Sequence, residues 1–487
     1  MRLATLVALC APLAILPLQA QTASAPPVVS SLRFVPGEMV ERVASSLDRS
    51  QHYAVYLPSA YRTDRKWPVL LLLDPRGRAL IPMGLARAAA ERHGYMVLSS
   101  YNTLSDGSNQ PNIDAMAAML TDAQRHFSVD PGRLYLVGFS GTARIAWEFA
   151  YGMRGNIAGI IGFGAGVPPG FEFERPGQTG PLPFVYYGGC GDGDFNYEEL
   201  LQLDQELDRW GVAHRLQFFE GPHSWPPARV MTDAIEWMEL QAARKGLALK
   251  DSLWIDSLFT AGLERARTRE DSGETYEAFL GYRALATDFA GLRDVSWAEG
   301  KAAGLEKSAP VRGVIRRQQE MIARNRIYLR KLGSFLADFR KAKSPPGVDR
   351  ALKTLEIDRL KKRLADTSDR ESALAAGRML AQAAVFTSFY EPRDYLARQE
   401  PARALAMLAI AEAVRPRSSI CYDRARALGM LQRQEEAVKA LACWASQSRP
   451  DPDSLAADTD LAMLHGHPAF EALVARLKEG PILPAHP

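Results

Sequence analysis

The sequence has few of the features that would indicate metal, nucleotide or nucleic-acid chemistry. Only four cysteines occur among 487 residues, and none stands with histidines at the spacing of a zinc site. The phosphate-binding pattern G-x-x-x-x-G-K-[ST] is absent. The formal net charge is only +3, so nothing suggests nucleic acid or an anionic membrane as a partner. We therefore expect no metal and no cofactor.

Long hydrophobic runs are missing after the N-terminus. There, Arg2 precedes an almost wholly apolar stretch from Leu3 to Leu18 that contains two prolines. This pattern is typical of a secretory signal peptide, here residues 1–20 with cleavage after Ala20, or alternatively after Ala25. A membrane anchor is the competing interpretation, but the run is short for a bilayer span. We expect a secreted or periplasmic protein without a transmembrane segment after signal removal.

Residues 31–245, after a linker at 21–30, alternate between strand-like and helix-like patterns. Gln51 to Leu57 alternates apolar and polar residues, as a half-buried lead-in strand does. Pro68 to Leu73 is uniformly apolar, which indicates a strand buried on both faces of a central parallel sheet. Alternating strands and helices predict an α/β domain with a doubly wound, mostly parallel sheet.

The stretch from Arg133 to Ala150 is the most informative part of that domain. An apolar run ends in Gly138-Phe139-Ser140-Gly141, and apolar residues then recur at helical spacing. Strand, sharp turn and helix with a serine at the apex describe a nucleophile elbow. Thr142 stands where the last glycine of G-x-S-x-G is expected. An ordinary glycine-serine turn between a strand and a helix is the alternative interpretation.

Two further predicted strand ends carry groups that a serine nucleophile needs. A glycine-rich loop contains Asp192 and Asp194, and a Pro/Gly loop after the last strand contains His223. A serine requires a base to take its proton, and the base requires a carboxylate to orient it. We prefer Asp194 as the acid because it directly precedes a helix start, with Asp192 as the alternative. Each of these residues is, in the simpler interpretation, only part of a turn.

These motifs resemble known enzymes. Gly138 to Gly141, with Ala143-Arg144, is similar to the GFSGGAR elbow of α/β-hydrolases close to dienelactone hydrolases and polyhydroxyalkanoate-depolymerase-type esterases. The stretches that begin at Asp194 and His223 resemble the acid and histidine motifs of such relatives, and the similarity covers about residues 32–243.

The resemblance implies Ser140 as nucleophile, His223 as base and Asp194 as acid. The oxyanion hole would use the backbone N–H groups of Gly141 and Arg76. Dienelactone hydrolases proper use a cysteine where Ser140 stands, so their substrate is not carried over. The expected activity is hydrolysis of small or polymeric carboxylic esters through an acyl-enzyme. A serine peptidase or amidase with the same triad is one alternative, and a catalytically inactive scaffold that binds partners is another.

The second half of the chain is predicted to be helical, with regions 252–343 and 348–487 separated by a Ser-Pro-Pro-Gly break. Ala404, Leu408 and Pro416 recur as Ala437, Leu441 and Pro450, at intervals of 33, 33 and 34 residues. This period resembles tetratricopeptide-type repeats, and a plain helical bundle is the alternative. Such repeats often bind partner proteins, so a protein partner or self-association through this region is a further possibility.

The cysteines bear on this second half as well. An exported protein would retain Cys190, Cys421 and Cys443. The last two lie eleven residues on either side of Gln432, the expected turn of a helical hairpin, and would therefore face each other. We predict a disulfide between Cys421 and Cys443, with two reduced cysteines in contact as the alternative and Cys190 as a thiol beside the active site.

Overall fold

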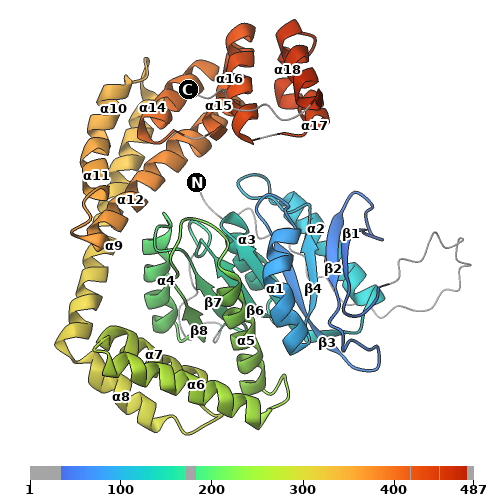
Figure 1. The fold of residues 1–487 in the computed structure, drawn as a ribbon, viewed down its shortest axis with the longest axis vertical. Coiled ribbons are helices and arrows are strands. Elements are labelled where there is room, and N and C mark those ends of the chain that lie inside the picture. Colours follow the sequence, from blue (N-terminus) through green and yellow to red (C-terminus); the bar gives the residue numbers. More distant parts are fainter. Residues whose placement is uncertain (1–33, 172–181, 417, 449, 480–487) are drawn as a thin grey trace, which may run out of the picture. The chain divides into compact units, whose positions relative to one another are not determined.

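A computed structural model describes residues 34–171, 182–416, 418–448 and 450–479 (Figure 1). The predicted signal peptide and linker, residues 1–30, lie outside the described residues. The chain divides into two compact units. The first comprises the chain up to Gly191 together with Glu199–Arg316, and the second comprises Asp192–Glu198 together with the chain from Arg317 onward.

The first unit contains an eight-stranded sheet with the order β1-β2-β4-β3-β5-β6-β7-β8 (Figure 1). β1 and β2 run antiparallel to their neighbours, and the remaining strands are parallel. The mostly parallel sheet predicted from the sequence is therefore confirmed. The strands are β1 (Met39–Ala44), β2 (His52–Tyr56), β3 (Trp67–Leu73), β4 (Met96–Ser100), β5 (Val129–Phe139), β6 (Ile157–Phe163), β7 (Val185–Gly189) and β8 (His214–Leu216).

Burial explains why the central strands lack a polar face. All seven residues of β3 are buried, because β4 and β5 flank it in the sheet and helices cover both faces. The helices that alternate with these strands are α1 (Leu80–His93), α2 (Gln110–His126), α3 (Gly141–Gly152), α4 (Tyr197–Arg209) and α5 (Ala228–Arg244). Residues of α1 and α5 join one hydrophobic core with the strands. Since parallel strands end at the same edge, loops after β3, β5 and β7 share one side of the sheet.

Three more helices belong to the first unit and share a separate apolar cluster: α6 (Ser252–Asp271), α7 (Thr275–Asp288) and α8 (Ser296–Glu306). A long helix, α9 (Ala309–Lys341), begins in the first unit and ends in the second. The compact first unit therefore extends past residue 245, where the sequence pattern placed the end of the sheet domain.

The second unit is helical in its described residues beyond α9. Its elements are α10 (Val348–Thr354), α11 (Ile357–Leu364), α12 (Arg370–Val385), the π-helix η3 (Phe386–Tyr390), α13 (Glu391–Ala397), α14 (Pro401–Val414), α15 (Ser418–Met430), α16 (Gln434–Ser448), α17 (Pro452–Ala456), the 3₁₀-helix η4 (Thr459–Leu464) and α18 (Pro468–Glu479). The helical second half predicted from the sequence is confirmed. That its helices form tetratricopeptide-type repeats stays a prediction, although Ala404, Leu408, Ala437 and Leu441 are all fully buried.

The hairpin of α15 and α16 contains the disulfide. Gln432 has the left-handed φ of 60° that a tight turn between two helices requires. Cys421 and Cys443 are bonded in the structure, with their Cα atoms 6.1 Å apart. Cys190, the remaining described cysteine, is buried.

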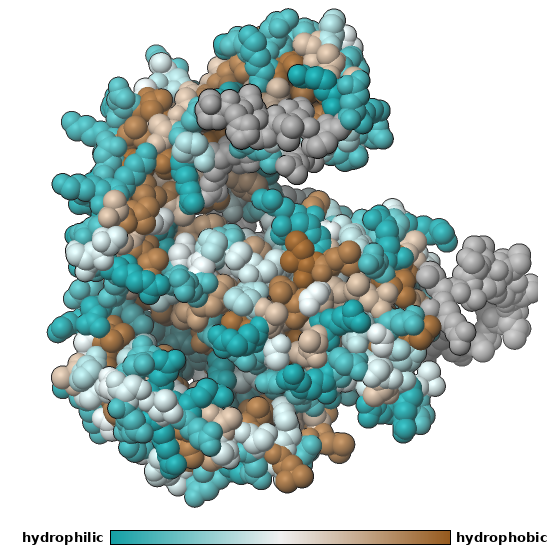
Figure 2. Space-filling model, viewed as in Figure 1, coloured by the Kyte–Doolittle hydropathy of each residue, from teal (hydrophilic) through white to brown (hydrophobic). Residues whose placement is uncertain are grey.

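The surface is largely hydrophilic on the face shown in Figure 2, where smaller hydrophobic groups interrupt it. Within the described ranges, no helix has both the length and the apolar character needed to cross a membrane.

Candidate active site

Ser140 lies between the end of β5 and the first residue of α3, in the strand–turn–helix arrangement that the sequence predicted. Its φ of 54° and ψ of −127° are unusual for a residue with a side chain. The backbone is held there by a hydrogen bond of 2.8 Å from the Ser140 N–H to the carbonyl of Phe163 in β6. Such strain persists only when the surroundings fix it, and it is often found at catalytic positions.

The glycines beside Ser140 are required by space. A Cβ on Gly138 would lie 2.4 Å from the carbonyl oxygen of Thr142, and one on Gly141 would lie 2.3 Å from Cβ of Ser105. Both distances are far below ordinary contact, so a side chain at Gly138 would displace backbone and one at Gly141 would displace Ser105.

Thr142 takes a different role from the glycine it replaces. Its side chain is fully buried, and its Oγ1 lies 2.6 Å from the carbonyl oxygen of Leu73 and 2.8 Å from that of Phe139. The same oxygen accepts a hydrogen bond of 3.1 Å from the Phe139 N–H. The threonine therefore joins the elbow to β3, which a glycine could not do.

His223 contacts the serine directly. Its Nε2 lies 2.9 Å from Oγ of Ser140, within hydrogen-bond range, and its ring centroid lies 4.7 Å from that of Phe139. A Cβ on Gly164 would come within 2.5 Å of the Phe139 ring and 3.2 Å of Cε1 of His223. Gly164 thus leaves the room in which the histidine ring packs. This pair can transfer a proton from the hydroxyl to the imidazole.

Asp74 and Trp225 belong to the same region and were not singled out from the sequence. Asp74 directly follows β3 and has a fully buried carboxylate, and Trp225 lies two residues beyond His223. The indole Nε1 of Trp225 donates to Oδ2 of Asp74 at 2.8 Å, and Arg78 donates to both carboxylate oxygens at 3.0 Å. Burial acts to raise the pKa of Asp74, but these hydrogen bonds outweigh it and hold the pKa below its usual value. The carboxylate therefore fixes the histidine loop to the end of β3.

The two predicted oxyanion-hole donors differ in whether the backbone N–H already has an acceptor in the structure. Gly141 is the first residue of α3, so its N–H has no acceptor inside the helix. The N–H of Arg76, in contrast, donates to Oδ1 of Asp74 at 2.8 Å. Arg76 would have to give up this bond to a buried carboxylate before it could bind an oxyanion. We therefore retain Gly141 and do not carry Arg76 into the proposed mechanism.

The two candidate acids lie in the segment Asp192–Glu198, which belongs to the second unit. Asp194 is fully buried, and its Oδ1 accepts a hydrogen bond of 2.9 Å from the Asn196 N–H. Asp192 is partly exposed, and its Oδ2 accepts from Arg370 at 3.1 Å. Asp194 is thus the more buried of the two candidates, while an arginine neutralises Asp192.

Gly191, the residue that precedes this segment in the chain, lies beside the histidine loop. Gly191 ends the preceding stretch of the first unit and forms a parallel bridge with Phe219. A Cβ on Gly191 would lie only 2.1 Å from the carbonyl oxygen of Gly221, two residues before His223. Asp194 follows Gly191 by three residues. The backbone that leads to the acid therefore starts directly beside the loop that carries the base.

A second cluster of titratable groups lies elsewhere in the first unit. Asp204, Asp208 and His214 place one ligand atom each within 4.8 Å of one another. Both carboxylates also pair with Arg283 at 3.3 Å, and Nδ1 of His214 lies 2.7 Å from the carbonyl oxygen of Val212. Burial lowers the pKa of His214, but the hydrogen bond to Asp204 and its charge outweigh burial and raise it. The cluster is an ion-pair network, and we assign no metal to it.

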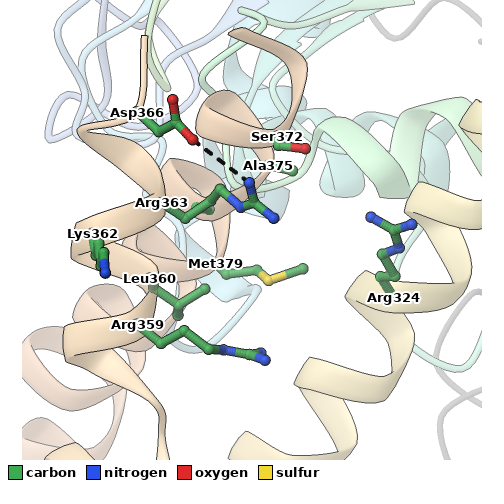
Figure 3. Close-up of a pocket in the computed structure, with 10 residues that line it drawn as sticks. Arg324, Arg359, Leu360, Lys362, Arg363, Asp366, Ser372, Ala375 and Met379 are labelled. Atoms are coloured by element: carbon green, nitrogen blue, oxygen red, sulfur yellow. Dashed lines mark ion pairs between the residues drawn. The ribbon is translucent and has the colours of Figure 1, made fainter. Parts of the chain in front are cut away.

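The second unit contains a hollow of about 700 Å³ between α9, α11 and α12 (Figure 3). Arg324 faces it from α9, and Arg359 and Arg363 face it from α11, above an apolar floor that includes Leu360 and Met379. Each arginine has an acidic neighbour, such as Asp366 at 3.7 Å from Arg363. The lining includes neither histidine nor cysteine, so we place no hydrolytic chemistry there.

No protein-family model and no curated protein matches the sequence. Solved structures do match the first part of the chain. A fluorophosphonate-binding serine hydrolase of Staphylococcus aureus is 17% identical with a TM-score of 0.35, covering 42% of this chain and 98% of its own. An S-formylglutathione hydrolase of the same organism is 16% identical with a TM-score of 0.35, covering 42% and 99%. A Bacillus cereus carboxylesterase is 18% identical with a TM-score of 0.30, covering 38% and 92%. At these values, only the residues of the site support a function.

Proposed function

We propose that this protein is an exported serine hydrolase of the α/β-hydrolase fold that cleaves carboxylic esters. The observation that carries the proposal is the 2.9 Å contact between Oγ of Ser140 and Nε2 of His223. The serine lies on a strained turn at the carboxyl end of a central strand, where parallel sheets place their active sites. Asp194 is the proposed acid, and its burial in the loop after β7 supports that role.

In the proposed reaction, His223 takes the proton of Ser140 while the hydroxyl oxygen attacks the ester carbonyl. The tetrahedral intermediate collapses, and the alcohol leaves with the proton returned by His223. Water, deprotonated by the same histidine, then attacks the acyl-enzyme and releases the acid. Asp194 keeps the imidazole in one tautomer and stabilises its cation.

The oxyanion would be bound by the N–H of Gly141 at the start of α3. An N–H at a helix N-terminus is oriented toward negative charge before the reaction starts. Loss of one such donor typically costs about 3–4 kcal/mol of transition-state stabilisation. The elbow geometry, which fixes Gly141 next to Ser140, therefore contributes to catalysis as well as to the exposure of the nucleophile.

Labelling with a fluorophosphonate probe tests the proposal. We expect the protein without residues 1–20 to be labelled, and we expect labelling to vanish in Ser140→Ala and His223→Ala. Ser108→Ala and His126→Ala are matched controls at exposed positions and should be labelled like the wild type. A folded wild type that is not labelled would refute the proposal and favour an inactive scaffold.

Two comparisons refine the proposed function. Parallel assays with p-nitrophenyl esters and with the corresponding p-nitroanilides distinguish an esterase from an amidase, and we expect turnover of the esters. Asp194→Asn should lower kcat by about 10³–10⁴-fold, as loss of the orienting carboxylate does in serine hydrolysis. Asp192→Asn should leave kcat within about twofold of the wild type, because its side chain points to Arg370. The reverse ranking would move the acid to Asp192.

A further inference from the structure

The segment Asp192–Glu198, which carries the proposed acid, is held by one face of α12. Arg378 donates from Nε to Oε1 of Glu198 and from a terminal nitrogen to the carbonyl oxygen of Asp192, both at 2.8 Å. One helical turn later, Gln382 donates to the carbonyl oxygen of Phe195 at 2.8 Å. All of these residues belong to the second unit. Residues four apart in a helix share a face, so the two side chains act on the segment together.

These contacts are shielded from water. The side chains of Arg378 and Glu198 are only 3% and 2% exposed, and the guanidinium lies 4.5 Å from the ring centroid of Tyr197. Burial raises the pKa of Glu198 although the charge of Arg378 opposes it. In the described part of the chain, Oε2 of Glu198 is buried without a hydrogen-bond partner. Arg378 is therefore the group that compensates the buried charge of Glu198 in this segment.

The contacts of Arg378 and Gln382, here called the anchors of the segment, lie on both sides of the proposed acid in the chain. Arg378 fixes the backbone at Asp192, two residues before Asp194, and Gln382 fixes it at Phe195, one residue after. A carboxylate that orients a catalytic imidazole has to be held to within about 0.5 Å, and such precision comes from the residues that support it. Supporting contacts on both sides of Asp194 meet this requirement.

We propose that Arg378 is a positioning residue for the hydrolase, which sets the backbone of the Asp194 segment. The proposal rests on the proposed function, in which Asp194 is the acid. The proposal gives the second unit a role other than the binding of a partner protein through the predicted repeats. Loss of α12 would remove these contacts to the segment of the proposed acid.

The first test compares Arg378→Gln with Arg378→Lys in the full chain without residues 1–20. We expect Arg378→Gln to lower kcat for a p-nitrophenyl ester by about 10–100-fold, with KM changed less than about twofold, because the acid but not the substrate site is displaced. Arg378→Lys should recover part of kcat, since it keeps the buried charge. The matched control is Arg403→Gln, which removes comparable bonds to the carbonyl oxygens of Phe339 and Ala342 in the same unit. It should retain wild-type kcat.

A double-mutant cycle separates positioning from general damage. If Arg378 acts through Asp194, then Arg378→Gln should change kcat less than about twofold in an Asp194→Asn background. The same fold loss in both backgrounds would overturn the proposal, as would wild-type kcat in Arg378→Gln. If that variant does not fold, Arg378→Met with Glu198→Met removes both buried charges and is tested in its place. Wild-type kcat in this pair would also overturn the proposal.

Failure of the proposed function looks different in these measurements. A wild type that is neither labelled by fluorophosphonate nor active on esters refutes the serine hydrolase itself. An active wild type whose kcat is unaffected by Asp194→Asn refutes the assignment of the acid, and with it the role of Arg378. An active wild type with a defective Asp194→Asn and a normal Arg378→Gln refutes only the positioning role.

Discussion

Replacement of Asp74 by asparagine is the perturbation for which the structure gives the clearest expectation. The carboxylate of Asp74 accepts from the N–H of Arg76, from the N–H and side chain of Arg78 and from the indole of Trp225. Every one of these groups is a donor. An asparagine has one acceptor oxygen and one NH₂ group, so in either orientation of the amide at least two donors face another donor.

The cost follows from the groups left without an acceptor. With the oxygen kept toward the backbone N–H groups, the indole of Trp225 and one nitrogen of Arg78 lose their bonds. A buried donor without a partner costs about 1–3 kcal/mol. The side chain of Arg78 is 43% exposed and can turn to water, which reduces its share to at most about 1 kcal/mol. We therefore expect Asp74→Asn to destabilise the fold by about 1–4 kcal/mol.

Urea unfolding of the full chain, followed by tryptophan fluorescence, measures this loss. The matched control is Asp64→Asn, an exposed carboxylate paired with Arg62 at 2.7 Å, which should cost less than about 0.5 kcal/mol. Since the pKa of Asp74 is lowered in the folded protein, its contribution is present above about pH 3.9 and is lost as the pH falls through the lower folded value. The gap between wild type and Asp74→Asn should therefore close below pH 4. Equal stability of Asp74→Asn and Asp64→Asn at pH 7 would refute the reasoning.

Three further predictions concern single side chains. Thr142→Val removes the hydroxyl that serves two buried backbone groups and should cost about 2–3 kcal/mol in urea unfolding, whereas Thr142→Ser should cost about 1 kcal/mol. His214→Gln should lower the free energy of unfolding more at pH 5.5 than at pH 9. The pKa of His214 is raised in the folded protein, so its charged form stabilises the fold below the unfolded pKa of about 6.5, and this contribution is lost as the pH rises. Equal losses of unfolding free energy at the two pH values would contradict this prediction. Gly164→Ala should slow fluorophosphonate labelling at least about tenfold, since its Cβ meets the Phe139 and His223 rings, while Gly155→Ala, with a similar positive φ and open space, should not.

The parts of the structure that the sequence predicted are those that local patterns encode. A strand buried on both faces has to be continuously apolar, as Pro68 to Leu73 is, and a turn with positive φ between a strand and a helix requires glycines around Ser140. Such patterns span a few residues and can be identified without knowledge of the fold. The mostly parallel sheet followed from repeating them along the chain.

Local patterns of this kind do not predict contacts between residues that are far apart in the sequence. Asp74 and Trp225 are separated by 151 residues, and Arg378 and Glu198 by 180. The sequence shows a carboxylate after a buried strand at Asp74, but an aspartate in that position is also ordinary turn chemistry. Nothing near Arg378 distinguishes it from the other arginines of a helical region. Only the folded chain shows that the buried carboxylate of Asp74 bonds to the loop of His223. The same is true of the buried Arg378, which bonds to the segment of Asp194.

The extent of the first unit also depends on contacts between residues that are distant in the sequence. The change from alternating strands to helices near residue 246 suggested a domain boundary, yet α7 remains tied to the sheet unit. The indole of Trp237 in α5 donates to the buried carboxylate of Asp288 at the end of α7, at 2.8 Å, and Arg215 in β8 pairs with the same carboxylate. Buried polar groups of this kind are costly to separate, because each would lose its partner away from water. A boundary is therefore set by where such bonds end and not by where the secondary structure changes. By the same criterion, the Asp194 segment belongs with α12, and a truncation at residue 245 should remove both the helices that complete the sheet unit and the side chains that hold the segment of the proposed acid.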